Sequence, residues 1–145
     1  MRKGEPVKGL EFFDLLYADK EFCDEFGRCL LEAARLESKL TVYLITKGIL
    51  DKYGKDNLGT LIRLAKKHGE LDQILPALKS LKDQRDYLTH NLYALYSSLI
   101  EEKLLSRSNL IDSDVDILTD RVSQLREDFQ ALGNILSKCA SPKNV

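Results

Sequence analysis

The chain has 145 residues, of which 43% are hydrophobic and 31% charged, and its formal net charge is −1. This length and composition are typical of one globular domain that buries a single core without disulfides or metal. A nearly neutral chain is not a polycation, so nucleic-acid binding would require a local basic patch. The sequence has no run of 18 apolar residues, so we expect no membrane-spanning helix.

The N-terminal residues and the cysteines predict a cytoplasmic protein. Residues 1–8 are expected to form a flexible lead, and they lack the apolar stretch of a secretion signal. The three cysteines, Cys23, Cys29 and Cys139, are an odd number without a CxxC pair. This pattern is typical of reduced thiols in the cytosol and disfavours a disulfide framework or a zinc site.

Apolar residues spaced alternately four and three apart predict helices along the chain. A short apolar helix is expected over residues 10–17. Asp19 is a suitable N-cap for a long helix that ends at Lys47-Gly48 and Tyr53-Gly54, where glycine can supply the terminating turn.

Two more helices are expected before residue 106. Asp56 or Asn57 caps a shorter helix that stops at Lys67-His68-Gly69, where cations favour the C-terminal end of the helix dipole. Pro76 suits the first turn of a third helix, which is expected to continue to Leu104-Leu105.

Ser113 or Asp114 is expected to cap the last helix, and residues 141–145 are expected to fray. The sequence therefore predicts an all-α fold. We expect an antiparallel four-helix up-and-down bundle over residues 9–140, with a short extra N-terminal helix.

One charged residue interrupts the apolar stripe of the third helix. Arg85 continues the spacing of its aliphatic neighbours, which are Ile74, Leu78, Leu81, Leu88 and Leu92. A guanidinium on a core-facing stripe is costly unless an anion or a water-filled cavity meets it. Arg85 is therefore a candidate functional residue.

His90, five residues after Arg85, lies on another face of the same helix. At 100° per residue the two side chains point about 140° apart, so they cannot act on one atom within a straight helix. His90 shares its face with Asp86, Tyr87 and Tyr93. Asp86 could accept a hydrogen bond from the imidazole, and the aromatic residues suit an interface between two copies of the helix.

Cations gather near Arg85 in the sequence, namely Arg63, Lys66, Lys67, Lys79 and Lys82. They could form an electrostatic footprint for a phosphodiester backbone. They could equally form an ordinary solvated face, because aspartates and glutamates are interspersed among them.

Other chemistries find no support in the sequence. The two histidines lack zinc-ligand spacing, no thiol lies near either of them in sequence, and the eight glycines are scattered rather than gathered in a phosphate-binding loop. His68 is explained as a partner of the helix dipole at the end of the second helix. We therefore expect no metal and no cofactor.

The segment 85–90, Arg-Asp-Tyr-Leu-Thr-His, resembles the motif of HEPN-domain proteins: Arg, a polar residue, three more residues, then His. A long first helix followed by a short helix around residues 58–64 also resembles that superfamily. The resemblance covers most of the chain as architecture and six residues as a specific motif.

The resemblance implies a metal-independent endoribonuclease that works as a homodimer on single-stranded RNA, often as the toxin of a toxin–antitoxin or phage-defence system. His90 would take the proton from a ribose 2′-hydroxyl or give one to the leaving 5′-oxygen. Arg85 would hold the scissile phosphate, and Asp86 would orient one of these two side chains. Both copies of the motif would meet across the dimer.

Four residues near the motif, Lys82, Tyr87, Asn91 and Tyr93, are expected to contact the RNA, and the resemblance implies a cognate antitoxin protein as a partner. In one branch of the family, a nucleotidyltransferase modifies a Tyr two residues after the His. This chain has Leu92 at that position and Tyr93 one residue later, so it departs from that branch.

The alternative function is a non-catalytic helical interaction module, because many bundles of this size only bind partners. Arg85 would then form a buried ion pair with Glu32 or Glu37, and His90 would be an interface residue. Binding of nucleotide or RNA without cleavage is a third reading that the residues leave open.

Overall fold

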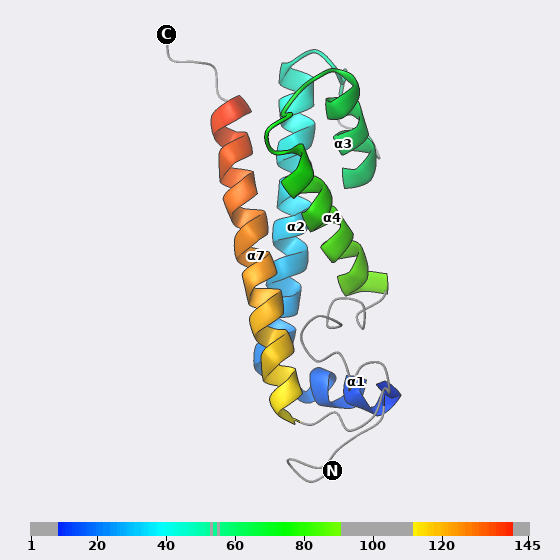
Figure 1. Cartoon of the computed structure of the whole chain (residues 1–145), viewed down its shortest axis with the longest axis vertical. Helices are drawn as coiled ribbons and strands as arrows, with labels where there is room; N and C mark the ends of the chain where they lie inside the picture. The colour runs from blue at the N-terminus through cyan, green and yellow to red at the C-terminus, as the bar shows by residue number, and fades with distance from the viewer. Residues whose placement is uncertain (1–8, 53, 55, 91–111, 141–145) are drawn as a thin grey trace.

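A computed structural model describes residues 9–52, 54, 56–90 and 112–140. These residues form helices and connecting turns, and the described part contains no strand (Figure 1). The predicted all-α bundle with a short N-terminal helix is therefore confirmed. The helices are α1 (Gly9–Ala18), α2 (Lys20–Thr46), α3 (Leu58–Lys67), α4 (Leu75–His90) and α7 (Asp112–Ala140). The expected lead 1–8, the continuation of the third helix to Leu104-Leu105 and the tail 141–145 lie outside the described residues.

The predicted caps of α2 and α3 are present. The Asp19 carboxylate accepts a 2.7 Å hydrogen bond from the backbone N–H of Phe22. Of the two candidates for α3, Asn57 is the cap, and its side chain accepts a 2.9 Å bond from the N–H of Thr60. Gly48 and Gly69 follow the two helices with φ values of 75° and 65°, which glycine adopts without a steric penalty.

The start of α7 differs from the prediction. Ser113 and Asp114 lie inside the helix, which the structure describes from Asp112 onward, so neither residue stands before its first turn. Asp114 is only 2% exposed, and its backbone is already helical. The prediction was misled because an acidic residue in a first turn resembles a cap in the sequence.

The helices α2 and α7 lie side by side along most of their length and run in the same direction (Figure 1). Arg126 Nε, in the middle of α7, donates a 2.7 Å hydrogen bond to the Glu25 carboxylate near the start of α2. Further along both helices, a Cβ built on Gly133 would lie 3.4 Å from the side chain of Lys39. Strict up-and-down connectivity would have made these two helices antiparallel.

The connection between α2 and α3 accounts for this parallel arrangement. Leu58, at the start of α3, donates to Glu37 in the middle of α2, and Glu70, just after α3, accepts a bond from Tyr43 near the end of α2. Both helices therefore run in the same direction. The chain returns along α2 before α3 begins, and α4 then runs the opposite way (Figure 1).

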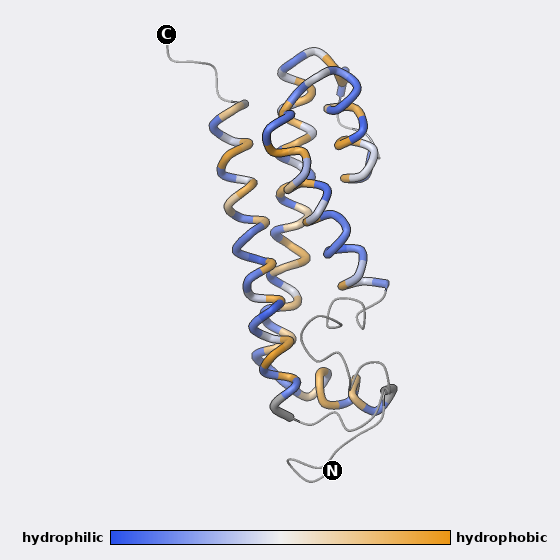
Figure 2. Tube along the Cα trace, viewed as in Figure 1, coloured by the Kyte–Doolittle hydropathy of each residue, from blue (hydrophilic) through white to orange (hydrophobic). Residues whose placement is uncertain are grey.

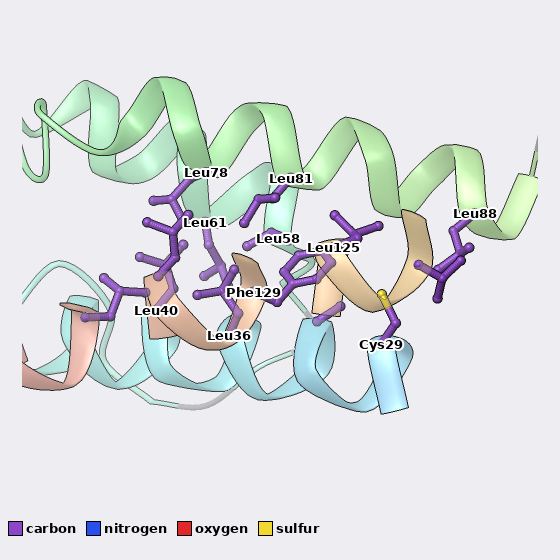
Figure 3. Packing of buried hydrophobic residues seen from close by; sticks show 14 of the residues in the cluster. Cys29, Leu36, Leu40, Leu58, Leu61, Leu78, Leu81, Leu88, Leu125 and Phe129 are labelled. Carbon is purple, nitrogen blue, oxygen red and sulfur yellow. The ribbon is translucent and has the colours of Figure 1, made fainter. Parts of the chain in front are cut away.

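The hydrophobic core lies between α2 and α7 and is covered by α3 and α4. Figure 3 shows Leu78, Leu81 and Leu88 of α4 pointing toward the other helices. Figure 2 shows that α1 is mostly hydrophobic, whereas the second half of α4 is mostly hydrophilic. Side chains that are at most 1% exposed fill the centre, and they include Leu36, Leu40, Leu58, Leu61, Leu125 and Phe129. Among the described helices, none combines the length and apolarity needed to cross a bilayer.

Candidate functional site

Arg85 lies on the buried side of α4, as its place in the apolar stripe predicted. Leu78, Leu81 and Leu88 are at most 5% exposed, but the side chain of Arg85 remains 23% exposed. The guanidinium therefore sits at the margin of the core, where it contacts protein on one side and solvent on the other. This placement avoids most of the desolvation cost of a buried charge.

Two carboxylates from different helices hold the Arg85 guanidinium. Its Nε donates to Asp86 Oδ1 over 3.2 Å, and its Nη1 lies 3.8 Å from Glu37 Oε2 on α2. The same Glu37 oxygen accepts a 2.9 Å hydrogen bond from the backbone N–H of Leu58, the first residue of α3. Arg85 is thus electrostatically linked to α2 and to the start of α3.

Of the two proposed ion-pair partners of Arg85, the structure selects Glu37. Glu32 instead pairs with Arg35 of its own helix, over 3.1 Å. The Arg85–Glu37 pair is partly exposed rather than buried, since 23% and 32% of the two side chains are accessible. An ion pair that is 3.8 Å long and partly exposed is weak, so it orients the guanidinium and leaves part of it accessible to solvent.

Asp86 orients Arg85. It accepts the hydrogen bond from Arg85 Nε and also pairs with Lys82 Nζ over 2.7 Å, one helical turn earlier. Partial burial acts to raise the pKa of Asp86, but the hydrogen bond from Lys82 and the charges of Lys82 and Arg85 outweigh it and lower the pKa. The carboxylate is therefore ionised at neutral pH. Among the described residues, Asp86 therefore contacts Arg85 and Lys82. The sequence had also suggested His90 as its hydrogen-bond partner, because the two residues share a helix face.

Cations from α3 and α4 come together beside Arg85. A Cβ built on Gly59 would lie 3.3 Å from Lys82 Cε and 3.9 Å from Arg63 Nη1, so these two side chains flank the first turn of α3. Arg63 also donates to Thr60 over 3.1 Å. The sequence placed Lys82 and Arg63 in the candidate basic patch, and the structure brings these two close together. Asp86 and Glu37 remain interspersed with them, as the solvated-face interpretation required.

His90 has different surroundings from Arg85. It is exposed at the last described residue of α4 and lines a hollow of about 500 Å³ between α4, α1 and the start of α2. Arg85 instead faces Glu37. The two motif residues thus meet separate neighbours, in agreement with the angle of about 140° expected for positions five apart on a helix.

The hollow contains residues that the sequence did not connect with His90. The aromatic rings of Phe13 and Tyr17 from α1 and of Phe26 from α2 line it, as does the thiol of Cys23. Cys23 is remote from His90 in sequence, and its Sγ lies 3.4 Å from the carbonyl oxygen of Leu16. A search for a thiol near a histidine along the chain could not reveal that both line one hollow, because this arises from the packing of α4 beside the start of α2.

The remaining predicted contact residues have separate outcomes. Tyr87 is 43% exposed on the outer face of α4, where it is available to a partner or a substrate. Asn91 and Tyr93 lie outside the described residues. Thr89, between Tyr87 and His90, donates its hydroxyl to the backbone oxygen of Arg85 over 3.2 Å.

Thiols and other metal ligands do not cluster in the part of the chain that the structure describes, where no three His, Cys, Asp or Glu side chains gather closely enough to hold a metal ion. Cys29 is buried between α2 and α7, and burial raises the pKa of its thiol to about 12. This thiol is therefore protonated and unreactive at neutral pH.

Comparison with known proteins adds no relative. Neither a scan against models of protein families nor searches of curated proteins and of solved structures find a match to this chain.

Proposed function

We propose that this protein is a metal-independent endoribonuclease of the HEPN type, acting as a toxin–antitoxin or phage-defence component, with Arg85 and His90 combined across a homodimer. The observation that carries the proposal is the state of Arg85. Its guanidinium is fixed by Asp86 and Glu37 and yet remains 23% exposed, next to Lys82. A positioned and accessible guanidinium is suited to bind a phosphate through two parallel hydrogen bonds.

The outer face of α4 supports the dimer in this proposal. Tyr87 is exposed on that face and His90 is exposed at the end of the helix, and aromatic side chains are enriched at the centres of protein interfaces. Two copies of α4 related by a two-fold axis would each bring His90 toward the partner's motif. This arrangement removes the difficulty that the two side chains point apart within one chain.

The reaction would be an in-line transfer at phosphorus. His90 takes the proton from the ribose 2′-hydroxyl, whose oxygen attacks the phosphorus, and the bond to the 5′-oxygen breaks. A water proton goes to that leaving oxygen, which gives a cyclic phosphate and a 5′-hydroxyl. Arg85 stabilises the negative charge that develops on the phosphoryl oxygens, and Asp86 keeps Arg85 oriented.

The test is cleavage of single-stranded RNA by the purified full chain in EDTA. We expect cyclic phosphate ends, a loss of about 10²–10⁴-fold in rate for His90→Ala, and a loss of about 10²–10³-fold for Arg85→Ala. Arg35→Ala and His68→Ala are matched controls, because both residues are exposed outside the motif helix. Circular dichroism must show that each variant is folded. If either motif variant cuts as fast as the parent, the proposal is wrong.

A second function is favoured by the contact between Arg85 and Glu37. Since Glu37 also binds the N–H of Leu58, Arg85 could be no more than the partner of this carboxylate, in an ion pair of a non-catalytic interaction module. In that case Arg85→Leu should leave the free energy of unfolding unchanged or raise it. A large stability loss in His90→Ala would also favour the module, because an exposed catalytic histidine contributes little to folding.

A further inference from the structure

The hollow beside His90 has the properties of a small-molecule site. Its volume of about 500 Å³ lies within the range of about 300–1,000 Å³ that is common for ligand pockets. Aromatic residues of α1 and α2 line one side of it, and Thr89 and His90 lie on the α4 side. We propose that this hollow holds a nucleobase of the RNA strand next to the scissile phosphate. This inference rests on the proposed ribonuclease function.

The exposure of the aromatic rings favours a stacked base as the occupant. Tyr17 is 87% exposed and Phe13 is 41% exposed, although both line the hollow. An aromatic face left in water is stabilised when a flat heterocycle stacks on it, and single-stranded nucleic acids are commonly bound in this way. The accessible ring of Tyr17 can therefore meet a base that enters the hollow.

The polar groups of the hollow match the edge of a base rather than an aliphatic chain. His90 is the titratable residue on the α4 side of the hollow, and the neighbouring Thr89 hydroxyl donates to the backbone of its own helix, while Leu16, Phe22 and Phe26 make the opposite walls apolar. A purely aliphatic ligand would offer no hydrogen-bonding group to the exposed imidazole of His90, whereas a nucleobase carries donors and acceptors at its edge and apolar faces. Because His90 is also the proposed proton-transfer group, a base bound here would place its own ribose near the imidazole.

The experiment measures binding separately from cleavage. A fluorescein-labelled oligonucleotide with 2′-O-methyl groups lacks the 2′-hydroxyl nucleophile, so anisotropy reports its binding without turnover. We expect Tyr17→Ala to raise the dissociation constant about tenfold, because a base–aromatic stack has roughly this effect. Tyr17→Phe should bind within about twofold of the parent, because it keeps the ring face. Leu31→Ala is the matched control, since Leu31 is 69% exposed on α2 and does not line the hollow.

An oligonucleotide with one base removed tests the same contact from the RNA side. The position of the missing base is varied along the strand. When the missing base is the one that would occupy the hollow, the parent should bind the strand about tenfold more weakly than the intact strand. Tyr17→Ala should bind that abasic strand no more weakly than the parent does. If Tyr17→Ala and Phe13→Ala both bind the intact strand as the parent does, or if the parent does not bind it, the base site is wrong.

Cleavage of unmodified RNA, assayed in parallel, separates this inference from the proposed function. Weaker binding by Tyr17→Ala together with no cleavage by the parent would support the base site and refute the nuclease. Normal cleavage together with unchanged binding by Tyr17→Ala would refute the base site alone. Because Tyr17 is 87% exposed, its substitution should leave the fold intact, and circular dichroism of the variant checks this.

Discussion

Glu37 is the residue whose removal most directly tests how Arg85 is held. Its carboxylate is shared between the N–H of Leu58, at 2.9 Å, and Nη1 of Arg85, at 3.8 Å. Glu37→Ala removes both interactions at once. Glu37→Gln keeps an oxygen that can accept from Leu58 but removes the negative charge. The pair of variants therefore separates the hydrogen bond from the electrostatic contribution.

The structure sets the expected magnitudes. Leu58 is fully buried, so its N–H cannot easily turn to water when Glu37 is lost, and an unsatisfied donor of this kind costs about 1–3 kcal/mol. The pair with Arg85 is longer than a hydrogen bond and partly exposed, so it contributes about 0.5 kcal/mol. Glu37→Ala should therefore lower the free energy of unfolding by about 2 kcal/mol. Glu37→Gln should lower it by about 1 kcal/mol, because the favourable charge at the start of α3 is also lost.

Urea unfolding followed by circular dichroism measures both values. Glu32→Ala is the matched control, because Glu32 lies on the same helix but pairs with a 60% exposed Arg35 side chain. Its effect should stay below about 0.5 kcal/mol. If Glu37→Ala unfolds within about 0.5 kcal/mol of the parent, the link between Arg85 and the start of α3 is not what holds this region together.

Three further predictions concern the core and the titratable groups. Phe129→Ala removes a ring that is 1% exposed and leaves a cavity in the core, so it should lower the free energy of unfolding by about 3–5 kcal/mol, measured in urea. The pKa of Tyr43 is raised from 10.0 to about 12 by burial and by its 2.6 Å hydrogen bond to Glu70, so the unfolded chain releases this proton first as the pH rises. The stabilisation that this raised pKa provides is fully present below pH 10 and should be lost as the pH rises toward 12. The free energy of unfolding should therefore fall more steeply over this range in the parent than in Tyr43→Phe; equal slopes would contradict this assignment. At pH 8, a thiol-reactive disulfide should modify the exposed Cys23 within minutes and leave the buried Cys29 intact in the folded protein. Equal rates of modification at the two thiols would refute the burial of Cys29.

Local helix signals were readable in the sequence because they depend on neighbouring residues. Asp19, Asn57, Gly48 and Gly69 have the predicted roles, since capping and termination are decided within one turn of the helix. Ser113 shows the limit of such reasoning, because polar residues inside a first turn resemble a cap.

The relative directions of the helices were not readable in the same way. The contact of Leu58 with Glu37 shows that α3 begins beside the middle of α2 rather than at its end. Apolar spacing gives the buried face of each helix but says nothing about how far a connection travels before the next helix begins. The parallel course of α2 and α7 follows from that connection.

The candidate site was predictable only within α4. The place of Arg85 on the core-facing stripe and the divergence of His90 follow from spacing along one helix, whereas the 23% exposure of the Arg85 side chain does not. The selection of Glu37 over Glu32, and the placement of Cys23 and His90 around one hollow, require helices that are remote in sequence to pack together. No pattern along a single chain carries that information.

Complementation between two inactive variants tests the central claim most directly. Arg85→Ala and His90→Ala are unfolded together, refolded as a mixture, and assayed on single-stranded RNA in EDTA. If each site takes Arg85 from one copy and His90 from the other, about half of the dimers are mixed and each holds one intact site, so about a quarter of the parent activity should return. A mixture that stays as inactive as either variant alone would contradict a site shared across the dimer.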